Sequence, residues 1–199
     1  MEINEIKHGF KLVSINYVED INSNLYQYEH IKSGGRVVHI QNDDPHCTFA
    51  IGFRTLPKDS TGVCHIIEHS LLCGSKKYPL KEPFVNLLKS SLATFLNAFT
   101  AYDWTMYPFA SQTPKDFDNI LSIYLDAVFN PLSMKYPKPF LQEGWHLELL
   151  NKEDLPVIKG VVYNEMKGAT SSVDDVLEST VNEIMYKDTI YRHNSGGDP

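Results

Sequence analysis

Two histidines and a glutamate share one short stretch of this chain, "CHIIEHSLLC", residues 64–73. His65 and His69 are four residues apart, so on a helix their side chains lie about 40° apart around the axis, on one face. Two imidazoles on adjacent turns of one face are close enough to chelate a single metal ion. Glu68 is their neighbour, where its carboxylate can accept a proton from a water molecule activated by that metal.

The rest of this stretch is apolar on nearly every side, which is typical of a buried helix. The apolar residues of the predicted helix are Val63, Ile66, Ile67, Leu71 and Leu72. A buried imidazole or carboxylate without a partner costs several kcal/mol or shifts its pKa until it is neutral. A zinc ion would satisfy both histidines; the alternative is a pair of ordinary core histidines beside a glutamate bonded to backbone. The order H-x-x-E-H is the inverse of the zinc-peptidase motif H-E-x-x-H and favours zinc.

A zinc site of this kind needs a third protein ligand, and the candidates are Glu82, Glu143, Glu148 and Glu165. Glu165 lies in "GVVYNEMKGA", where helical spacing predicts that it faces inward with the apolar residues. Glu148 alternates with leucines in a predicted strand and is expected to face solvent. Glu82 and Glu143 lie near the ends of elements, where carboxylates are common. We predict Glu165 as the third ligand, with an inward salt bridge as the alternative.

The three cysteines raise a second hypothesis. Cys73 is four residues after His69 on the same face, so it and the two histidines could form a structural zinc site. That site leaves Glu68 without a role, and structural zinc sites usually have four protein ligands. Cys47 and Cys64 are expected to be small core residues. Three cysteines are too few, and odd in number, for a disulfide framework, which indicates a reducing compartment.

Turn residues and periodicity predict strands and helices around these groups. Residues 10–55 form four short β-prone runs separated by turns, which predicts an antiparallel meander. A helix is predicted over 62–72, with Ser60 or Thr61 as N-cap and Gly74 as the stop. Residues 95–111 predict two strands around a turn, and 144–150 a further strand. The other predicted helices are 82–91, 113–131 with Thr113 as N-cap, and 158–169.

The composition excludes several classes of protein. The chain has 199 residues, 42% of them hydrophobic, which is enough for a real core. A formal charge of −7 and the lack of a long basic cluster argue against a nucleic-acid partner. No run reaches the roughly 18 apolar residues that a membrane span needs, and the start lacks the features of a signal peptide. We expect a cytoplasmic protein that binds neither nucleic acid nor membranes.

The organisation predicts one α+β domain over residues 1–199, with a largely antiparallel sheet packed against helices. No internal repeat, low-complexity tract or linker interrupts it. The last residues, "YRHNSGGDP", contain no closing element. We therefore expect a fragment of a longer, multidomain chain.

Two stretches carry a family resemblance: "HIIEHSLLCGSKKYPLKEPFVNLLKSSLATFLNAFTAYDWTMYPFAS" and "GVVYNEMKGA". They closely resemble the presequence protease and falcilysin branch of the pitrilysin and insulin-degrading enzyme family of metallopeptidases. The separation of 96 residues between His69 and Glu165 is similar to that of the branch. The resemblance implies the fold of the first domain of these enzymes. It also implies one zinc ion per chain, held by His65, His69 and Glu165, with Glu68 as the general base.

The resemblance further implies a substrate and partners. In relatives, the stretch that matches Asn97, Ala98, Phe99 and Thr100 is a sheet edge that pairs with the substrate peptide; a core position is the alternative for Phe99. The implied activity is zinc-dependent cleavage of short unstructured peptides, weak in this chain alone because the remaining domains complete the enclosing chamber. The lack of a targeting segment differs from organellar relatives and indicates a bacterial cytosolic protein. A noncatalytic structural or assembly homologue and a zinc-binding module are the other hypotheses, and an intact Glu68 argues against both.

Overall fold

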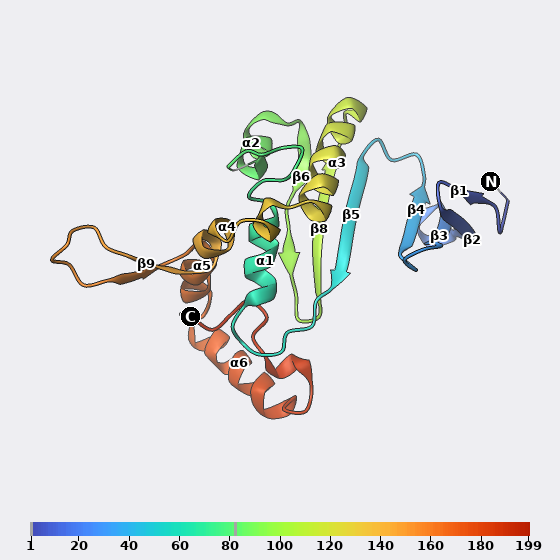
Figure 1. Cartoon of the computed structure of the whole chain (residues 1–199). Coiled ribbons are helices and arrows are strands. Elements are labelled where there is room, and N and C mark those ends of the chain that lie inside the picture. Colours follow the sequence, from blue (N-terminus) through green and yellow to red (C-terminus); the bar gives the residue numbers. More distant parts are fainter. Residues whose placement is uncertain (1, 82) are drawn as a thin grey trace. The chain divides into compact units, whose positions relative to one another are not determined.

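The computed structural model describes residues 2–81 and 83–199, and the chain divides into two compact units, Met1–Pro45 and His46–Pro199 (Figure 1). Antiparallel sheets and helices make up the structure, so the predicted α+β class is confirmed. Within the described residues, no helix has the length and apolar character needed to cross a membrane.

The first unit is a four-stranded antiparallel sheet in the order β1-β2-β3-β4. Its elements are β1 (Ile6–Lys7), β2 (Phe10–Val18), the 3-10 turn η1 (Glu19–Ile21), β3 (Ser23–His30) and β4 (Arg36–Gln41). Gly34, between β3 and β4, has a φ of 69°, which glycine adopts without a side-chain penalty. The first three strands of the predicted meander are therefore confirmed.

The sheet of the second unit is built around β8, in the order β5-β8-β6, with β7 also paired to β8. Its strands are β5 (Cys47–Arg54), β6 (Ala93–Leu96), β7 (Phe99–Thr100) and β8 (Trp104–Ser111). The meander prediction is wrong for β5, which pairs with β8 along its whole length and not with β4. That pairing places Phe49 and Ile51 against the core, so burial of apolar side chains outweighs the short connection to β4.

The α-helices of the described chain all belong to the second unit. They are α1 (Val63–Leu71), α2 (Pro83–Ser90), α3 (Pro114–Phe129), α4 (Lys138–Glu143), α5 (Val161–Ala169) and α6 (Val173–Met185), with 3-10 turns η2 (Leu132–Met134) and η3 (Ile190–Arg192). The sequence patterns predicted α1, α2, α3 and α5 but not α4 or α6. Thr113 is the N-cap of α3 as predicted, although its side chain makes no capping hydrogen bond.

A short hairpin separates α4 from α5. Its strands are β9 (His146–Glu148) and β10 (Val157–Lys159), which pair antiparallel, and Figure 1 shows the hairpin projecting away from the two helices. The hairpin begins and ends beside Gly144 and Gly160. A Cβ atom on Gly160 would lie only 1.9 Å from the Gly144 carbonyl oxygen, so glycine is needed for the chain to leave and rejoin the helical layer here.

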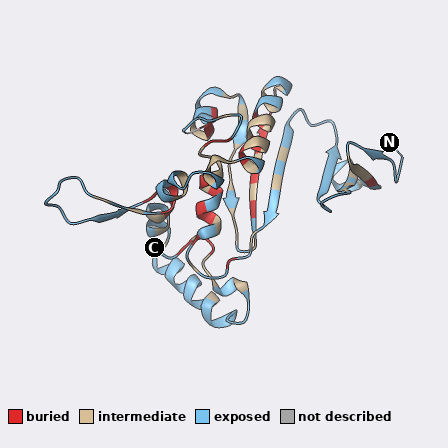
Figure 2. Cartoon of the chain, viewed as in Figure 1, coloured by how far each residue is buried: buried red, intermediate tan, exposed pale blue. Residues whose placement is uncertain are grey.

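The core of the second unit lies between the sheet and α3. Tyr107 and Phe109 of β8 are 1% and 0% exposed, and Ile120 and Tyr124 of α3 are equally buried. The rings of Phe109 and Tyr124 pack with centroids 5.2 Å apart, and Leu87 of α2 closes the cluster. Figure 2 shows buried residues along β8, α3 and α1. β8 contributes Tyr107 and Phe109 to this core, and it pairs with β7, which lies beside α1.

The start of α1 differs from the prediction. Gly62, with a φ of 70°, is the N-cap in place of Ser60 or Thr61. The helix ends at Leu71, just before the predicted stop at Gly74. It contacts β7, β8, α4 and α5, so elements from distant parts of the chain pack against it.

Candidate metal centre

The buried residues of α1 are mostly polar: His65, Glu68 and Ser70 are buried together with Ile66. His65 is 8% exposed and Glu68 5%, whereas Val63 and Ile67 are each 44% exposed. The prediction of a helix buried on all sides is therefore wrong: the side that carries the histidines and the glutamate faces the interior. This orientation requires partners for the buried imidazole and carboxylate.

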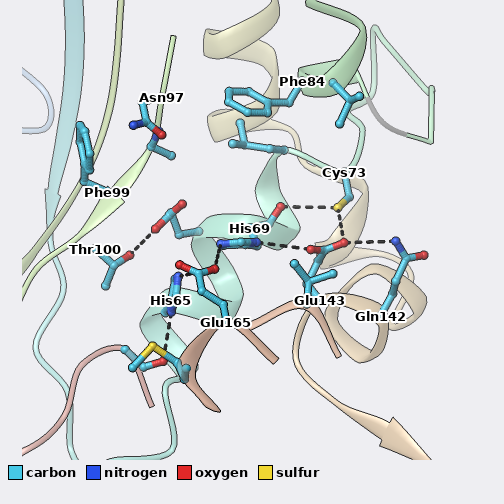
Figure 3. Close-up of a pocket in the computed structure, with 17 residues that line it drawn as sticks. His65, His69, Cys73, Phe84, Asn97, Phe99, Thr100, Gln142, Glu143 and Glu165 are labelled. Atoms are coloured by element: carbon cyan, nitrogen blue, oxygen red, sulfur yellow. Dashed lines mark hydrogen bonds and ion pairs between the residues drawn. The ribbon is translucent and has the colours of Figure 1, made fainter. Parts of the chain in front are cut away.

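Glu165 of α5 faces the two histidines of α1. Its Oε2 atom lies 3.7 Å from Nε2 of His65 and 3.5 Å from Nε2 of His69. One ligand atom from each residue of this trio lies within 4.8 Å of the others. The Glu165 side chain is 52% exposed, so the expectation that it faces a core is wrong. It faces an open pocket (Figure 3).

The donor set and its spacing fit zinc. Tetrahedral zinc has ligands at 2.0 to 2.2 Å, which places neighbouring ligand atoms about 3.4 Å apart. The distances from Oε2 of Glu165 to the two Nε2 atoms, 3.7 and 3.5 Å, are close to this value. Two imidazoles and one carboxylate suit zinc, and three protein ligands leave a position open for water or substrate.

Each histidine is held at its other ring nitrogen. Nδ1 of His65 lies 3.0 Å from the carbonyl oxygen of Gly196, and Nδ1 of His69 lies 3.4 Å from Oε2 of Glu143. Both acceptors favour a proton on Nδ1, which leaves the Nε2 lone pair directed at Glu165. Metal-binding histidines are commonly fixed in this way.

Glu143 is the residue that sequence reasoning missed. It was expected to be an ordinary carboxylate at the end of an element, but it is 7% exposed, contacts His69 and accepts hydrogen bonds from Cys73 Sγ and Gln142 Nε2. Burial alone would raise its pKa, but the hydrogen bonds from His69 and Cys73 and the charge of His69 lower it. Its helix, α4, has only six residues, too few for periodicity to reveal a buried face.

Glu68 is held by β7. Thr100 Oγ1 donates a hydrogen bond of 2.8 Å to Glu68 Oε2. Burial raises the pKa of Glu68 above its ordinary value, although this hydrogen bond and the nearby histidines act in the opposite direction. A carboxylate with a raised pKa is a better proton acceptor than a solvated one.

A cavity of about 830 Å³ opens beside these residues. Figure 3 shows His65, His69, Glu143 and Glu165 on one side of it, and Asn97, Phe99 and Thr100 on another. Leu72, Phe84 and Val85 add an apolar wall. The cavity therefore joins a group of possible metal ligands, a buried carboxylate and an apolar surface.

The four residues predicted to bind substrate lie along this cavity. Asn97 and Ala98 connect β6 to β7, and Phe99 and Thr100 form β7. Both strands pair with β8 on one side. On the other side, no strand of the described chain pairs with β6 or β7. Phe99 is 42% exposed, so its alternative placement as a core aromatic is wrong.

Among the described residues, the other candidates are not in the group of possible metal ligands. Cys73 Sγ contacts Glu143 and the backbone of His69, and it is not in the group of possible ligands found among the described residues. Glu148 lies on β9 and is likewise outside that group. Glu82 lies outside the described residues. Cys47 is exposed, so its placement in the core is wrong, and Cys64 is half-buried.

Comparison with known proteins shows the family of this chain. The family model described as "Insulinase (Peptidase family M16)" matches residues 38–195, and the chain belongs to that family. The crystal structure of pitrilysin has the same fold, with a TM-score of 0.69 at 19% identity over 96% of this chain and 19% of that one.

Individual relatives show which branch of the family this chain resembles. "Protein HypA" from Clostridium perfringens is 52% identical over 98% of this chain and 20% of its own length. "Presequence protease 1, chloroplastic/mitochondrial" from Arabidopsis thaliana is 49% identical over 97% of this chain and 18% of its own length. The predicted resemblance to the presequence protease branch is confirmed. The chain spans about a fifth of the length of these relatives.

Proposed function

We propose that this chain is the metal-binding catalytic domain of a zinc-dependent endopeptidase that cleaves short unstructured peptides, and that it forms one domain of a longer protein. His65, His69 and Glu165 hold one zinc ion, and Glu68 is the general base. The observation that carries the proposal is the place of Glu68: a buried carboxylate at the cavity, next to three grouped metal-ligand side chains.

The residues of the chain perform the proton transfers. When bound, zinc would polarise the carbonyl of the scissile peptide bond and lower the pKa of a water molecule, so that the water loses a proton and attacks the carbonyl at neutral pH. Glu68 accepts the proton of the attacking water and delivers it to the leaving amine. Thr100 keeps the Glu68 carboxylate in place through its 2.8 Å hydrogen bond, so the base does not reorganise during the reaction.

The sheet edge and the apolar wall select the substrate. An extended peptide adds to the free side of β6 and β7 by backbone hydrogen bonds, which tolerate many sequences. Leu72, Phe84 and Val85 line the cavity near the metal-ligand group and accept an apolar side chain beside the cleaved bond. A folded protein cannot supply such an extended strand, which favours unstructured peptides.

Two other functions fit the site less well. A noncatalytic homologue has no use for a buried carboxylate beside an open cavity, since Glu68 must be desolvated without any benefit. A structural zinc module usually has four protein ligands, whereas the group found in the described residues has three.

Zinc content tests the ligand set. The purified chain is expected to hold about one zinc ion, and Glu165→Ala is expected to lose it, because two imidazoles alone bind weakly. Glu183→Ala, at an exposed position of α6, is the matched control and should keep the metal. Elemental analysis after purification without chelator measures both. Equal zinc in the parent and Glu165→Ala would remove Glu165 from the site.

Glu68→Gln tests catalysis. The substitution preserves size but removes the proton acceptor, so hydrolysis of an unstructured fluorogenic peptide should fall about 10² to 10⁴-fold while zinc content is unchanged. The relatives are much longer than this chain, so the assay uses the complete protein. Glu153→Gln, in an exposed loop, is the control. Full activity in Glu68→Gln, or none in the parent, would contradict the proposed function.

A further inference from the structure

The segment Asn194–Asp198 lies across the start of α1. The backbone amide of Asn194 donates to Ser60 Oγ at 3.1 Å, and that of Asp198 donates to the Ser60 carbonyl at 2.8 Å. Ser195, between them, is only 8% exposed. We call this segment the strap. Its two ends are therefore anchored on the residues that lead into the helix of the histidines.

Glycines allow the strap to approach the helix at backbone distance. A Cβ atom on Gly62 would lie 2.7 Å from both the carbonyl oxygen of Gly196 and the Cα atom of Gly197. Such contacts do not occur in folded proteins, so a side chain at position 62 must push the strap away. Gly62 also has a φ of 70°, a conformation that disfavours other residues.

The strap also contacts the helix that carries Glu165. A Cβ atom on Gly196 would lie 2.7 Å from Sδ and Cε of Met166, the residue after Glu165. The strap therefore lies between α1 and α5, the two helices that supply the metal-ligand group. Its position is coupled to the separation of those helices.

The strap also contacts His65, one of the proposed zinc ligands, through the carbonyl of Gly196. The Gly196 carbonyl can only accept, so at 3.0 Å it holds the proton on Nδ1 of His65. Nε2 is then the lone-pair atom, and it is the nitrogen that faces Glu165. The two groups are 131 residues apart in sequence. Without the strap, the His65 ring would be free to rotate or to adopt the other tautomer.

We propose that the strap is a positioning element for His65, and that docking of the strap and binding of the metal stabilise each other. The inference rests on the proposed function only in taking His65 as a zinc ligand. Linkage requires the effect to be reciprocal: strap docking strengthens zinc binding by the same factor by which zinc strengthens docking. The strap acts through the orientation of the His65 ring, which its Gly196 carbonyl contacts.

Gly62→Ala displaces the strap and tests whether strap docking strengthens zinc binding. Zinc affinity of the protein, measured by competition with a chelator, should fall about 10 to 100-fold, the usual effect of losing a group that orients a metal ligand. Gly34→Ala is the matched control: Gly34 has a φ of 69° but nothing within 4 Å of its Cβ position. It carries the same backbone strain without the clash and should bind zinc as the parent does.

Ser60→Ala is the milder second variant. It removes the acceptor for the Asn194 amide without changing the backbone of α1, so it tests the strap even if Gly62→Ala folds poorly. Zinc affinity should fall in the same direction by a smaller factor. Thermal unfolding of the zinc-free proteins separates this effect from a general loss of stability.

Hydrogen exchange tests whether zinc binding strengthens docking of the strap. The amides of Asn194 and Asp198 report strap docking, and zinc should slow their exchange by the factor lost in Gly62→Ala. A parent without zinc would overturn the proposed function together with this inference. A parent that binds zinc, with unchanged affinity in Gly62→Ala and Ser60→Ala and no effect of zinc on these amides, would overturn this inference alone.

Discussion

His69 directs Nδ1 at Glu143, with 3.4 Å between the ring nitrogen and Oε2, while its Nε2 lies 3.5 Å from Glu165. The ring is thus placed between two carboxylates with different surroundings. The Glu143 side chain is 9% exposed, and that of Glu165 is 52% exposed. The buried Glu143 carboxylate orients the His69 ring, whereas the exposed Glu165 carboxylate faces the cavity together with that ring. Glu143 is therefore the positioning group and Glu165 the proposed ligand.

Removal of Glu143 is expected to weaken zinc binding without removing a ligand. Glu143→Ala should lower zinc affinity about 10 to 100-fold. Glu143→Gln should have an intermediate effect, because its amide oxygen still accepts from Nδ1–H but carries no charge. Chelator competition measures both, with Glu148→Ala as a control for a half-buried glutamate outside the group. Parent-like affinity in Glu143→Ala would show that His69 needs no partner at Nδ1.

Zinc binding is expected to strengthen as pH rises. Burial alone would lower the pKa of His69, but the hydrogen bond to Glu143 and the charges of Glu68, Glu165 and Glu143 together raise it above its ordinary value. Zinc binds the neutral ring, so below this raised pKa it must displace a proton, and above it no proton is displaced. Affinity should therefore increase with pH and level off above the pKa of His69.

Chelator competition across about pH 5 to 9 measures this dependence. Glu143→Gln provides the matched comparison, because loss of the carboxylate lowers the pKa of His69 and should move the plateau to lower pH. Superimposable pH curves for the parent and Glu143→Gln would contradict the role of Glu143.

Thr100 is expected to affect turnover but not zinc. Thr100→Val keeps the shape of the side chain and removes the hydrogen bond to Glu68. A hydrogen bond to a charged group is worth about 1.5 to 3 kcal/mol, so kcat should fall about 10-fold or more, with little change in KM. Thr48→Val, at an exposed position of β5, is the control. If kcat stayed at the parent value, Glu68 would not depend on β7 for its position.

Several elements could be predicted because their information is local. The 16 residues of α3 repeat an apolar face often enough to identify a helix, and α5 has the same signature. His65 and His69 share a face because any two helical residues four apart do so. The family resemblance, which is confirmed for the chain, rests likewise on contiguous stretches of sequence.

Other elements depended on partners far along the chain. β5 looked like the next strand of a meander, but its apolar residues are better buried against β8 and α3. The sequence predicted burial of α1 on all sides, but Val63 and Ile67 are exposed, because only β7, β8, α4 and α5 pack against the helix. Local periodicity identifies an amphipathic or apolar segment but not the elements that will cover it.

The sequence by itself determined the helix of His65, Glu68 and His69 and the chemistry that their spacing allows, since both follow from 3.6 residues per turn. Only the tertiary structure decided which groups hold them: Glu143 for His69, the Gly196 carbonyl for His65 and Thr100 for Glu68. The physical reason is that these partners are a residue of a very short helix, a backbone atom and a strand residue, none of which has a periodic pattern. Their roles arise only when packing brings distant segments within hydrogen-bonding distance.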